Sequence, residues 1–116
     1  MKRLMTAMLA TLTVTAALAE FPDKPITIVV PFAAGGPTDK VARDLAEALR
    51  KPLPNATIVI DNTGGAGGTL ATAKVARAPA DGYTLLVTDT TYSLLPHIFK
   101  KLPFDYANDL QPVAAF

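Results

Sequence analysis

Runs of hydrophobic residues alternate along the chain with amphipathic stretches, and this pattern predicts three strands separated by helices. Residues 26–30 (ITIVV) are β-branched and almost continuously apolar, which is typical of a parallel strand covered on both faces. Residues 57–60 and 83–87 repeat this character and predict two further strands. The resulting β-α-β-α-β order favours an α/β fold built on a parallel sheet.

The stretches between the strands predict helices with identifiable starts and ends. Pro37 suits the first helical position, Asp39 lies in the first turn, where an acid is favoured, and Pro52 ends the helix. We expect the apolar stripe of this helix to comprise Val41, Leu45, Ala48 and Leu49. Residues 69–78 form an alanine-rich segment that predicts a second helix packed closely on the sheet. A short helix is predicted over 92–101, interrupted or started near Pro96, and the apolar run 113–116 predicts the beginning of another strand.

Glycine-rich turns directly follow the first two predicted strands. The first glycine turn (residues 31–39) and the second glycine turn (residues 61–68) each open a predicted helix, so free backbone N–H groups at the helix start carry partial positive charge. Glycine also lets a backbone approach its ligand closely. Because ligands of parallel sheets bind beyond the carboxyl ends of the strands, we expect both turns to form one anion-binding edge, and a third polar turn (residues 88–91) lies at the same edge.

The N-terminus has the pattern of a secretory signal. Lys2 and Arg3 precede the apolar stretch 4–18, and Ala17-Leu-Ala19 has the small-x-small form of a cleavage site. The apolar stretch is shorter than the roughly 20 residues that a membrane-spanning helix needs. We therefore expect residues 1–19 to be a cleavable Sec signal peptide, residues 20–116 to be one small domain, and the mature protein to be exported.

Charge and composition then narrow the range of partners. Loss of Lys2 and Arg3 leaves nine basic and ten acidic residues, without any block of like charge, so we expect no nucleic-acid partner. The absence of cysteine excludes disulfides and thiolate metal sites. The glycine turns match neither the P-loop nor the dinucleotide pattern, since no Gly-Lys-Ser/Thr occurs and Leu70 occupies the third glycine position. The expected anion is therefore a carboxylate rather than a nucleotide phosphate.

Few side chains in the sequence suggest catalysis. Ser93 and His97 stand four residues apart, which leaves a small secreted hydrolase as an alternative, but no nucleophile elbow surrounds Ser93. A single histidine and scattered acids offer no metal-binding cluster. Asp39 is most simply a residue that completes hydrogen bonding in its own turn, and Asp89 is either a turn former or a receptor for a ligand's amine or hydroxyl. We expect no enzyme, no metal and no cofactor.

An ordered set of short motifs resembles the Bug family, the extracytoplasmic solute receptors of tripartite tricarboxylate transporters. The matching pieces extend from Phe21 to Phe116 and are Lys24-Pro-Ile, Val29-Val-Pro-Phe, Gly35-Gly-Pro-Thr-Asp39, Asn62 with Gly65-Ala-Gly-Gly68, Ala80-Asp-Gly-Tyr-Thr-Leu-Leu86, Lys101-Leu-Pro-Phe-Asp105 and Asp109-Leu-Gln-Pro-Val113. The order of these pieces makes the resemblance specific, although each motif alone is weak.

The resemblance implies a two-lobed periplasmic binding protein of the Venus-flytrap type that is a monomer and not an enzyme. Such receptors close on dicarboxylates, tricarboxylates or acidic amino acids and deliver them to membrane permease subunits. The ligand-binding positions that it implies lie in the three turns: Phe32, Ala33, Ala34, Gly35, Gly36, Pro37, Thr38, Asp39, Gly65, Ala66, Gly67, Gly68, Thr88, Asp89, Thr90 and Thr91.

Two departures from the family pattern lead to further expectations. Thr63 stands where the family often has a basic residue, so we expect no positive side chain to assist the second glycine turn. The family's members are about three times as long as the predicted mature chain, so we expect residues 20–116 to be the N-terminal part of lobe one, with the second lobe absent. A nonfunctional remnant of such a receptor is the alternative.

Overall fold

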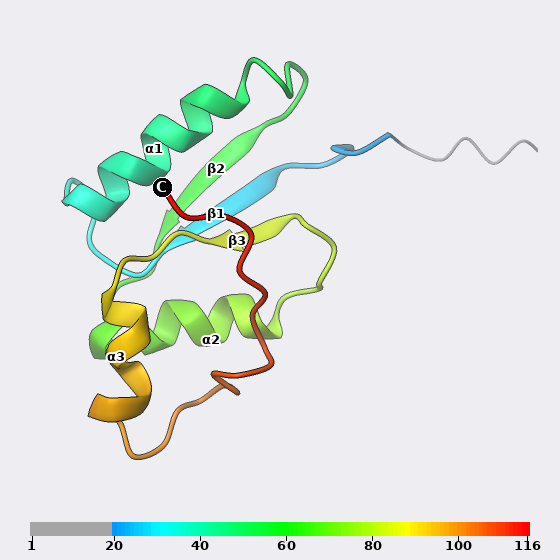
Figure 1. The fold of residues 1–116 in the computed structure, drawn as a ribbon. Coiled ribbons are helices and arrows are strands. Elements are labelled where there is room, and N and C mark those ends of the chain that lie inside the picture. The colour runs from blue at the N-terminus through cyan, green and yellow to red at the C-terminus, as the bar shows by residue number, and fades with distance from the viewer. Residues whose placement is uncertain (1–19) are drawn as a thin grey trace, which may run out of the picture.

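A three-stranded parallel sheet lies between helices on its two faces (Figure 1). The computed structural model describes residues 20–116. β1 (Ile26–Val30) is central, flanked by β2 (Ile58–Asn62) on one side and β3 (Thr84–Leu86) on the other. Ile28 of β1 is level with Ile60 of β2 and with Leu85 of β3. The predicted α/β fold with a parallel sheet is therefore confirmed, although β2 begins one residue later than expected and extends two residues further, to Asn62.

The side chains of β1 form the core on both faces of the sheet. Ile28 and Val30 are fully buried on one face, in a cluster with Ala42 of α1 (Pro37–Leu49). Val29 is fully buried on the opposite face, where it packs with Ala71 and other residues of α2 (Thr69–Arg77). The continuous apolar run in the sequence thus reflects a strand covered on both sides, as predicted.

α1 begins as the sequence predicts but buries a different stripe. Gly36 is the N-cap and Pro37 occupies the first helical position. Ala42 is fully buried, whereas Val41 is 39% exposed and Ala48 is exposed, so the predicted stripe is wrong at both of these positions. The buried face instead follows Thr38, Ala42, Leu45 and Ala46, because small alanine side chains let the helix approach the sheet closely.

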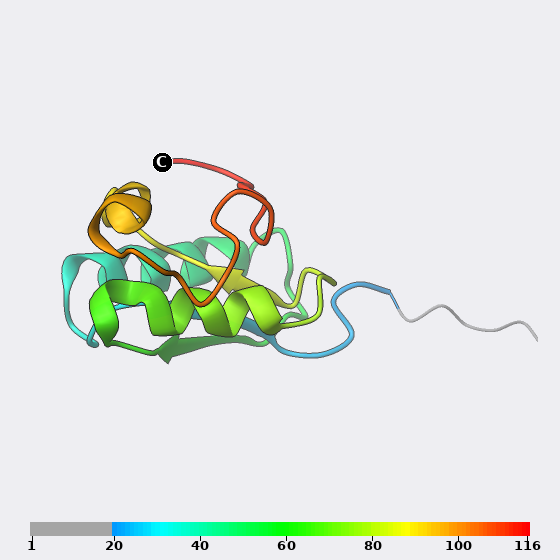
Figure 2. The same cartoon turned by 90° about the horizontal axis from the view of Figure 1, so that it is seen from below.

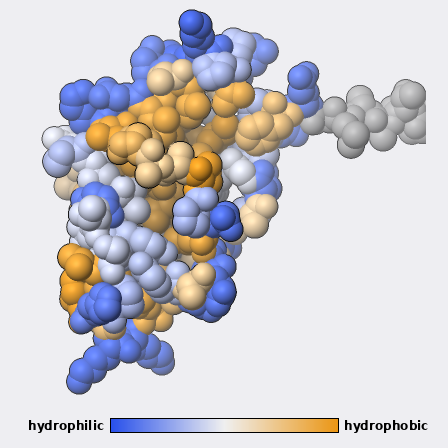
Figure 3. Space-filling model, viewed as in Figure 1, coloured by the Kyte–Doolittle hydropathy of each residue, from blue (hydrophilic) through white to orange (hydrophobic). Residues whose placement is uncertain are grey.

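Val41 and Ala48 instead border a hollow on the surface of α1. Leu45, Asp44 and the C-terminal Phe116 complete its lining. Figure 3 shows hydrophobic surface gathered in this region, between α1 and the end of the chain. The face of α1 that the periodicity assigns to the core therefore contributes to an exposed apolar patch.

α2 packs on two sides, which explains its alanine content. It follows a short 3-10 turn, η1 (Ala66–Gly68), and its Ala71 and Val75 face the sheet. Ala73 belongs to a second cluster with Leu95 of α3 (Thr91–Ile98) and Phe104. The predicted close packing of this helix is confirmed, and it applies on the side away from the sheet as well.

The C-terminal quarter of the chain departs furthest from the predicted elements. α3 runs through Pro96 and ends at Ile98, before the predicted end at residue 101. The chain then passes α2 and returns toward β3 (Figures 1 and 2). Residues 113–116 form no strand, and Val113 and Phe116 are 85% and 81% exposed. The predicted strand is wrong there because a strand needs a hydrogen-bonded neighbour, and within residues 20–116 none pairs with this run.

The predicted signal peptide, residues 1–19, lies outside the described residues. Within residues 20–116, no helix is both long enough and apolar enough to cross a bilayer.

Substitutions at neighbouring positions of α1 test which face is buried. Ala42→Val adds two methyl groups where the helix packs tightly on the sheet, and we expect it to lower the free energy of unfolding by about 1–3 kcal/mol. Val41→Ala removes methyl groups from the exposed side and should change it by less than about 0.5 kcal/mol. Urea unfolding followed by circular dichroism measures both values, and the reverse order would support the stripe predicted from periodicity.

Candidate functional site

The first and second glycine turns meet at the carboxyl edge of the sheet. The Thr63 N–H donates to the Val30 carbonyl at 2.9 Å, which joins the ends of β2 and β1. Gly64 lies beside the first turn, and a methyl group on it would be in ordinary contact with the Ala33 nitrogen, at 3.8 Å. The structure thus brings together the two turns that the sequence singled out.

The surface of this edge consists largely of backbone. Residues 33–35 and 64–67 are exposed, and they carry no charged side chain. The N-caps of α1 and α2 are Gly36 and Gly68, and neither supplies a side-chain hydrogen bond to its helix. Within residues 20–116, neither N-cap residue gives the first-turn N–H groups a side-chain acceptor, and the positive end of each helix dipole faces the turns.

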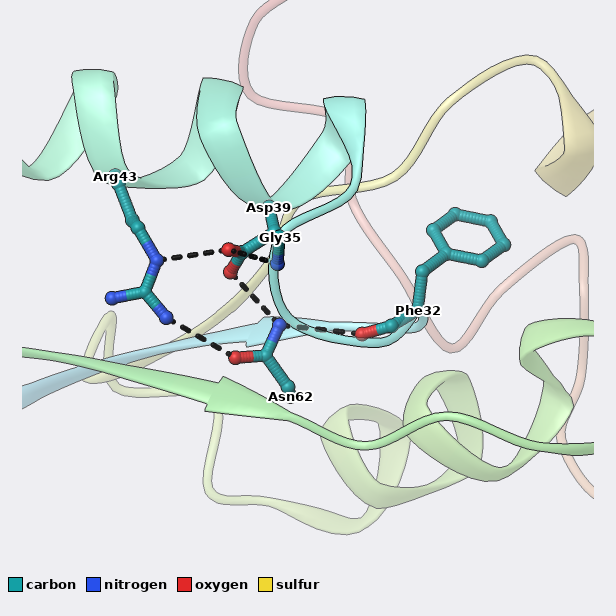
Figure 4. A network of polar contacts seen from close by, with 5 residues as sticks. All are labelled: Phe32, Gly35, Asp39, Arg43 and Asn62. Carbon is teal, nitrogen blue, oxygen red and sulfur yellow. Dashed lines mark hydrogen bonds and ion pairs between the residues drawn. The ribbon is translucent and has the colours of Figure 1, made fainter.

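Asp39 lies beneath the first glycine turn, with both carboxylate oxygens engaged inside the protein (Figure 4). Its Oδ2 accepts hydrogen bonds from the Gly35 N–H and from Arg43 Nε, each at 2.9 Å, and its Oδ1 accepts one from Asn62 Nδ2 at 2.9 Å. The side chain is only 4% exposed. The bond from Arg43, followed by those from Gly35 and Asn62, holds the pKa of Asp39 well below its usual range. The prediction that Asp39 completes hydrogen bonding in its own turn is confirmed.

Asn62 connects this carboxylate to the backbone of the first glycine turn. Its Nδ2 also donates to the Phe32 carbonyl at 3.2 Å, and its Oδ1 accepts a hydrogen bond from Arg43 Nη2 at 3.4 Å. From the sequence alone, Arg43 received no role, and Asn62 entered only as one of the positions that match the family. Two features of the sequence could have indicated this network: an asparagine at the end of a predicted strand, and an arginine one helical turn after Asp39.

The third turn reaches the first through one side-chain contact. Thr38 Oγ1 donates to Asp89 Oδ2 at 3.4 Å, while Asp89 Oδ1 accepts the Thr91 N–H at 2.9 Å. The hydrogen bond from the Thr91 side chain is the main cause that lowers the pKa of Asp89. Asp89 is therefore a turn former in this structure, and its exposed position leaves it at the same edge as the glycine turns.

Two side chains for which the sequence predicted no role border the second glycine turn. The ring of Phe99, at the end of α3, lies against Gly67, so that a methyl group there would be 3.3 Å from the ring. Lys74 of α2 forms an ion pair with Asp61, and its Nζ lies 3.5 Å from Thr63 Oγ1. α2 thus brings a lysine beside Thr63 from eleven residues further along the chain, but its charge is paired with Asp61, so the expectation that no positive side chain assists ligand binding at this turn stays a prediction.

Ser93 and His97, the pair considered for a hydrolase, do not form a catalytic hydrogen bond in the structure. Ser93 Oγ donates to the Thr90 carbonyl at 2.7 Å, within its own helical turn, so its proton is not directed at His97. Among residues 20–116, no group of three or more histidine, cysteine or acidic side chains is placed to hold a metal ion. The structure therefore gives no support to a serine–histidine pair.

Comparison with known proteins supplies a family. The model of the tripartite tricarboxylate transporter family receptor matches residues 41–116. Curated relatives are 34–42% identical to the chain. The chain spans only 27–33% of the length of these relatives.

Solved structures of longer proteins contain the same arrangement. The periplasmic binding protein BugD is 47% identical with a TM-score of 0.72, over 77% of this chain and 29% of BugD. Rpa4515 of R. palustris, solved with adipate, is 35% identical with a TM-score of 0.69, over 76% and 29% of the two chains. MatC (Rpa3494) from Rhodopseudomonas palustris, solved with bound malate, is 42% identical with a TM-score of 0.63, over 77% and 30%.

Acid denaturation tests the charge of Asp39. A carboxylate whose pKa is lowered in the folded state stabilises the fold fully above its unfolded pKa of about 3.9, and this contribution disappears as the pH falls through the folded pKa. We expect Asp39→Asn to be less stable than the parent chain at neutral pH and to lose less stability than the parent between about pH 5 and pH 2. Urea unfolding at several pH values in this range measures how the free energy of unfolding changes with pH for each chain. The same change with pH in both chains would contradict the hydrogen bonding described for Asp39.

The matched control is Asp44→Asn on the same helix. The Asp44 side chain is 66% exposed and pairs with Lys40 at the surface, where such pairs contribute little. We expect this variant to unfold almost like the parent chain at neutral pH.

Proposed function

Because the chain belongs to the tripartite tricarboxylate transporter receptor family, we propose that its glycine-turn edge captures one carboxylate of a small dicarboxylate or tricarboxylate. The observation that carries this proposal is the meeting of two exposed backbone turns, after β1 and β2, each of which opens a helix without a side-chain cap. Solute capture requires no catalytic group, which agrees with the engagement of Ser93 within its own helix.

Backbone N–H groups suit a carboxylate because they donate without adding a competing charge. A hydrogen bond to a charged group contributes about 1.5–3 kcal/mol, and a helix N-terminus about 0.3–1 kcal/mol. Both values fall when the site is open to water, as residues 33–35 and 64–67 are here. We therefore expect residues 20–116 to bind a free dicarboxylate no more tightly than about millimolar.

The related structures support a ligand class rather than a single ligand. Malate and adipate occupy different members of this group, and both are dicarboxylic acids whose chains differ in length. What they share is a terminal carboxylate, which is the part that backbone turns of this kind can recognise. Acidic amino acids carry the same group, and the exposed carboxylate of Asp89 would attract their ammonium or a ligand hydroxyl.

The proposed biological setting follows from the family. We place the receptor in the periplasm as a monomer that delivers its solute to the membrane permease subunits of a tripartite tricarboxylate transporter. BugD, a periplasmic binding protein that is 47% identical, supports this location.

A ligand titration followed by nuclear magnetic resonance tests the proposal directly. Adding malate at constant ionic strength to the ¹⁵N-labelled chain should shift the amide signals of residues 33–36 and 64–68, because an anion there changes the field at those N–H groups. The neutral diamide of malate is the control and should leave them in place. Shifts confined to surface lysines would contradict the proposed site, and micromolar affinity would contradict the expected weakness of an open edge.

A pair of glycine substitutions separates binding from stability. Gly35, in the first glycine turn, and Gly82, at the opposite end of the sheet before β3, have similar positive φ values of 90° and 83°. Neither has a close obstacle to an added methyl group. Gly35→Ala and Gly82→Ala should each lower the free energy of unfolding by about 1–2 kcal/mol, because alanine is strained in this region. Only Gly35→Ala should also weaken the malate-induced shifts. If both variants weakened these shifts equally, the loss of binding would come from lower stability and not from the first glycine turn.

A further inference from the structure

The side chain of Asn62 extends the hydrogen bonding of the sheet into the first glycine turn. Asn62 is the last residue of β2 and is level with Val30, the last residue of β1. The backbone bonding between these strands ends at Thr63, whose N–H donates to the Val30 carbonyl. Beyond that point the Asn62 amide donates to the Phe32 carbonyl at 3.2 Å.

The neighbours of Asn62 dictate the orientation of its amide. Nδ2 faces two acceptors, the Phe32 carbonyl and Asp39 Oδ1, while Oδ1 faces the guanidinium of Arg43. An aspartate at this position would direct an oxygen at both acceptors. The position therefore requires a side chain that donates on one side and accepts on the other.

Holding the Phe32 carbonyl also sets the direction of the next N–H group. The peptide between Phe32 and Ala33 is trans, so its carbonyl and its N–H point in opposite directions. The Ala33 N–H therefore points away from Asn62. Ala33 is exposed, and the neighbouring Gly64 has no side chain that would crowd its nitrogen.

We infer that Asn62 is a positioning residue, which aims the Ala33 N–H at the carboxylate bound in the first glycine turn by holding the Phe32 carbonyl. Asp39 and Arg43 in turn hold Asn62 (Figure 4). By contrast, the Gly35 N–H is occupied by Asp39 and is not available to a ligand. This inference rests on the proposed function for the identity of the ligand, but the orientation of the turn can be measured without a ligand.

The test compares Asn62→Asp with the double variant Asp39→Asn/Asn62→Asp. The single variant brings two carboxylates together beside the Phe32 carbonyl. The double variant exchanges the two side chains, so it retains a carboxylate for Arg43 and an amide–carboxylate bond, but it leaves the Phe32 carbonyl without a donor. A role in stability alone predicts that the exchange rescues both folding and binding, whereas a positioning role predicts rescue of folding only.

Two measurements on the double variant decide between these roles. In the ligand-free chain, we expect the ¹⁵N order parameter of Ala33 to fall from about 0.85 to below about 0.6. In the malate titration, we expect the dissociation constant to rise about tenfold or more, as when one hydrogen bond to an anion is lost. An unchanged order parameter together with parental affinity would overturn the inference, whether or not the single variant folds.

Asn108→Asp is the matched control. Asn108 also donates to a neighbouring carboxylate, Asp105 Oδ2, at 2.9 Å, but it lies outside the three turns. It should leave both measurements unchanged. If malate shifts no turn amide of the parent chain, the proposed function fails, and the order parameter of Ala33 in the double variant still decides the positioning role.

Discussion

Burial of β1 on both faces is the constraint on which the rest of the structure depends. Ile28 and Val30 are closed off by α1, and Val29 by α2, so a helix must follow β1 and another must follow β2. Parallel strands joined by such crossovers all end at the same edge of the sheet. The two glycine turns are therefore neighbours as a consequence of burying β1 on both faces. Each turn opens a helix whose N-terminal N–H groups face that edge.

The charged side chains beside the two glycine turns act within the protein. Asp39, Arg43 and Asn62 satisfy one another beneath the first glycine turn, and Lys74 pairs with Asp61 beside the second. A buried carboxylate is tolerated only when it is fully hydrogen-bonded, and the donors around Asp39 meet that condition. Consequently the exposed part of both turns is backbone, which can recognise a carboxylate without fixed charges that would compete for it.

The sequence predicted most of the fold because its signals are local. The β-branched run at 26–30 and the proline at position 37 each specify their own element, and the glycine turns follow directly from the strands. The periodicity of α1 was less informative, since Val41 and Ala42 are adjacent and apolar and only the sheet decides which of them is buried. Likewise, the hydrophobic run at the C-terminus resembles a strand, but a strand also needs a neighbouring backbone, which residues 20–116 do not provide for it.

The sequence by itself determined the order of the elements, the parallel sheet and the two turns at its carboxyl edge, because each depends on residues close together in the chain. Only the tertiary structure decided which groups in those turns remain free. The Gly35 N–H is occupied by Asp39, and the Phe32 carbonyl by Asn62, thirty residues away along the chain. Lys74 reaches Thr63 in the same way, from a different element. The Asp39–Gly35 bond lies within one turn and was predicted, but the bonds of Asn62 and Lys74 depend on side chains that meet only once the sheet has formed, so no local pattern records them.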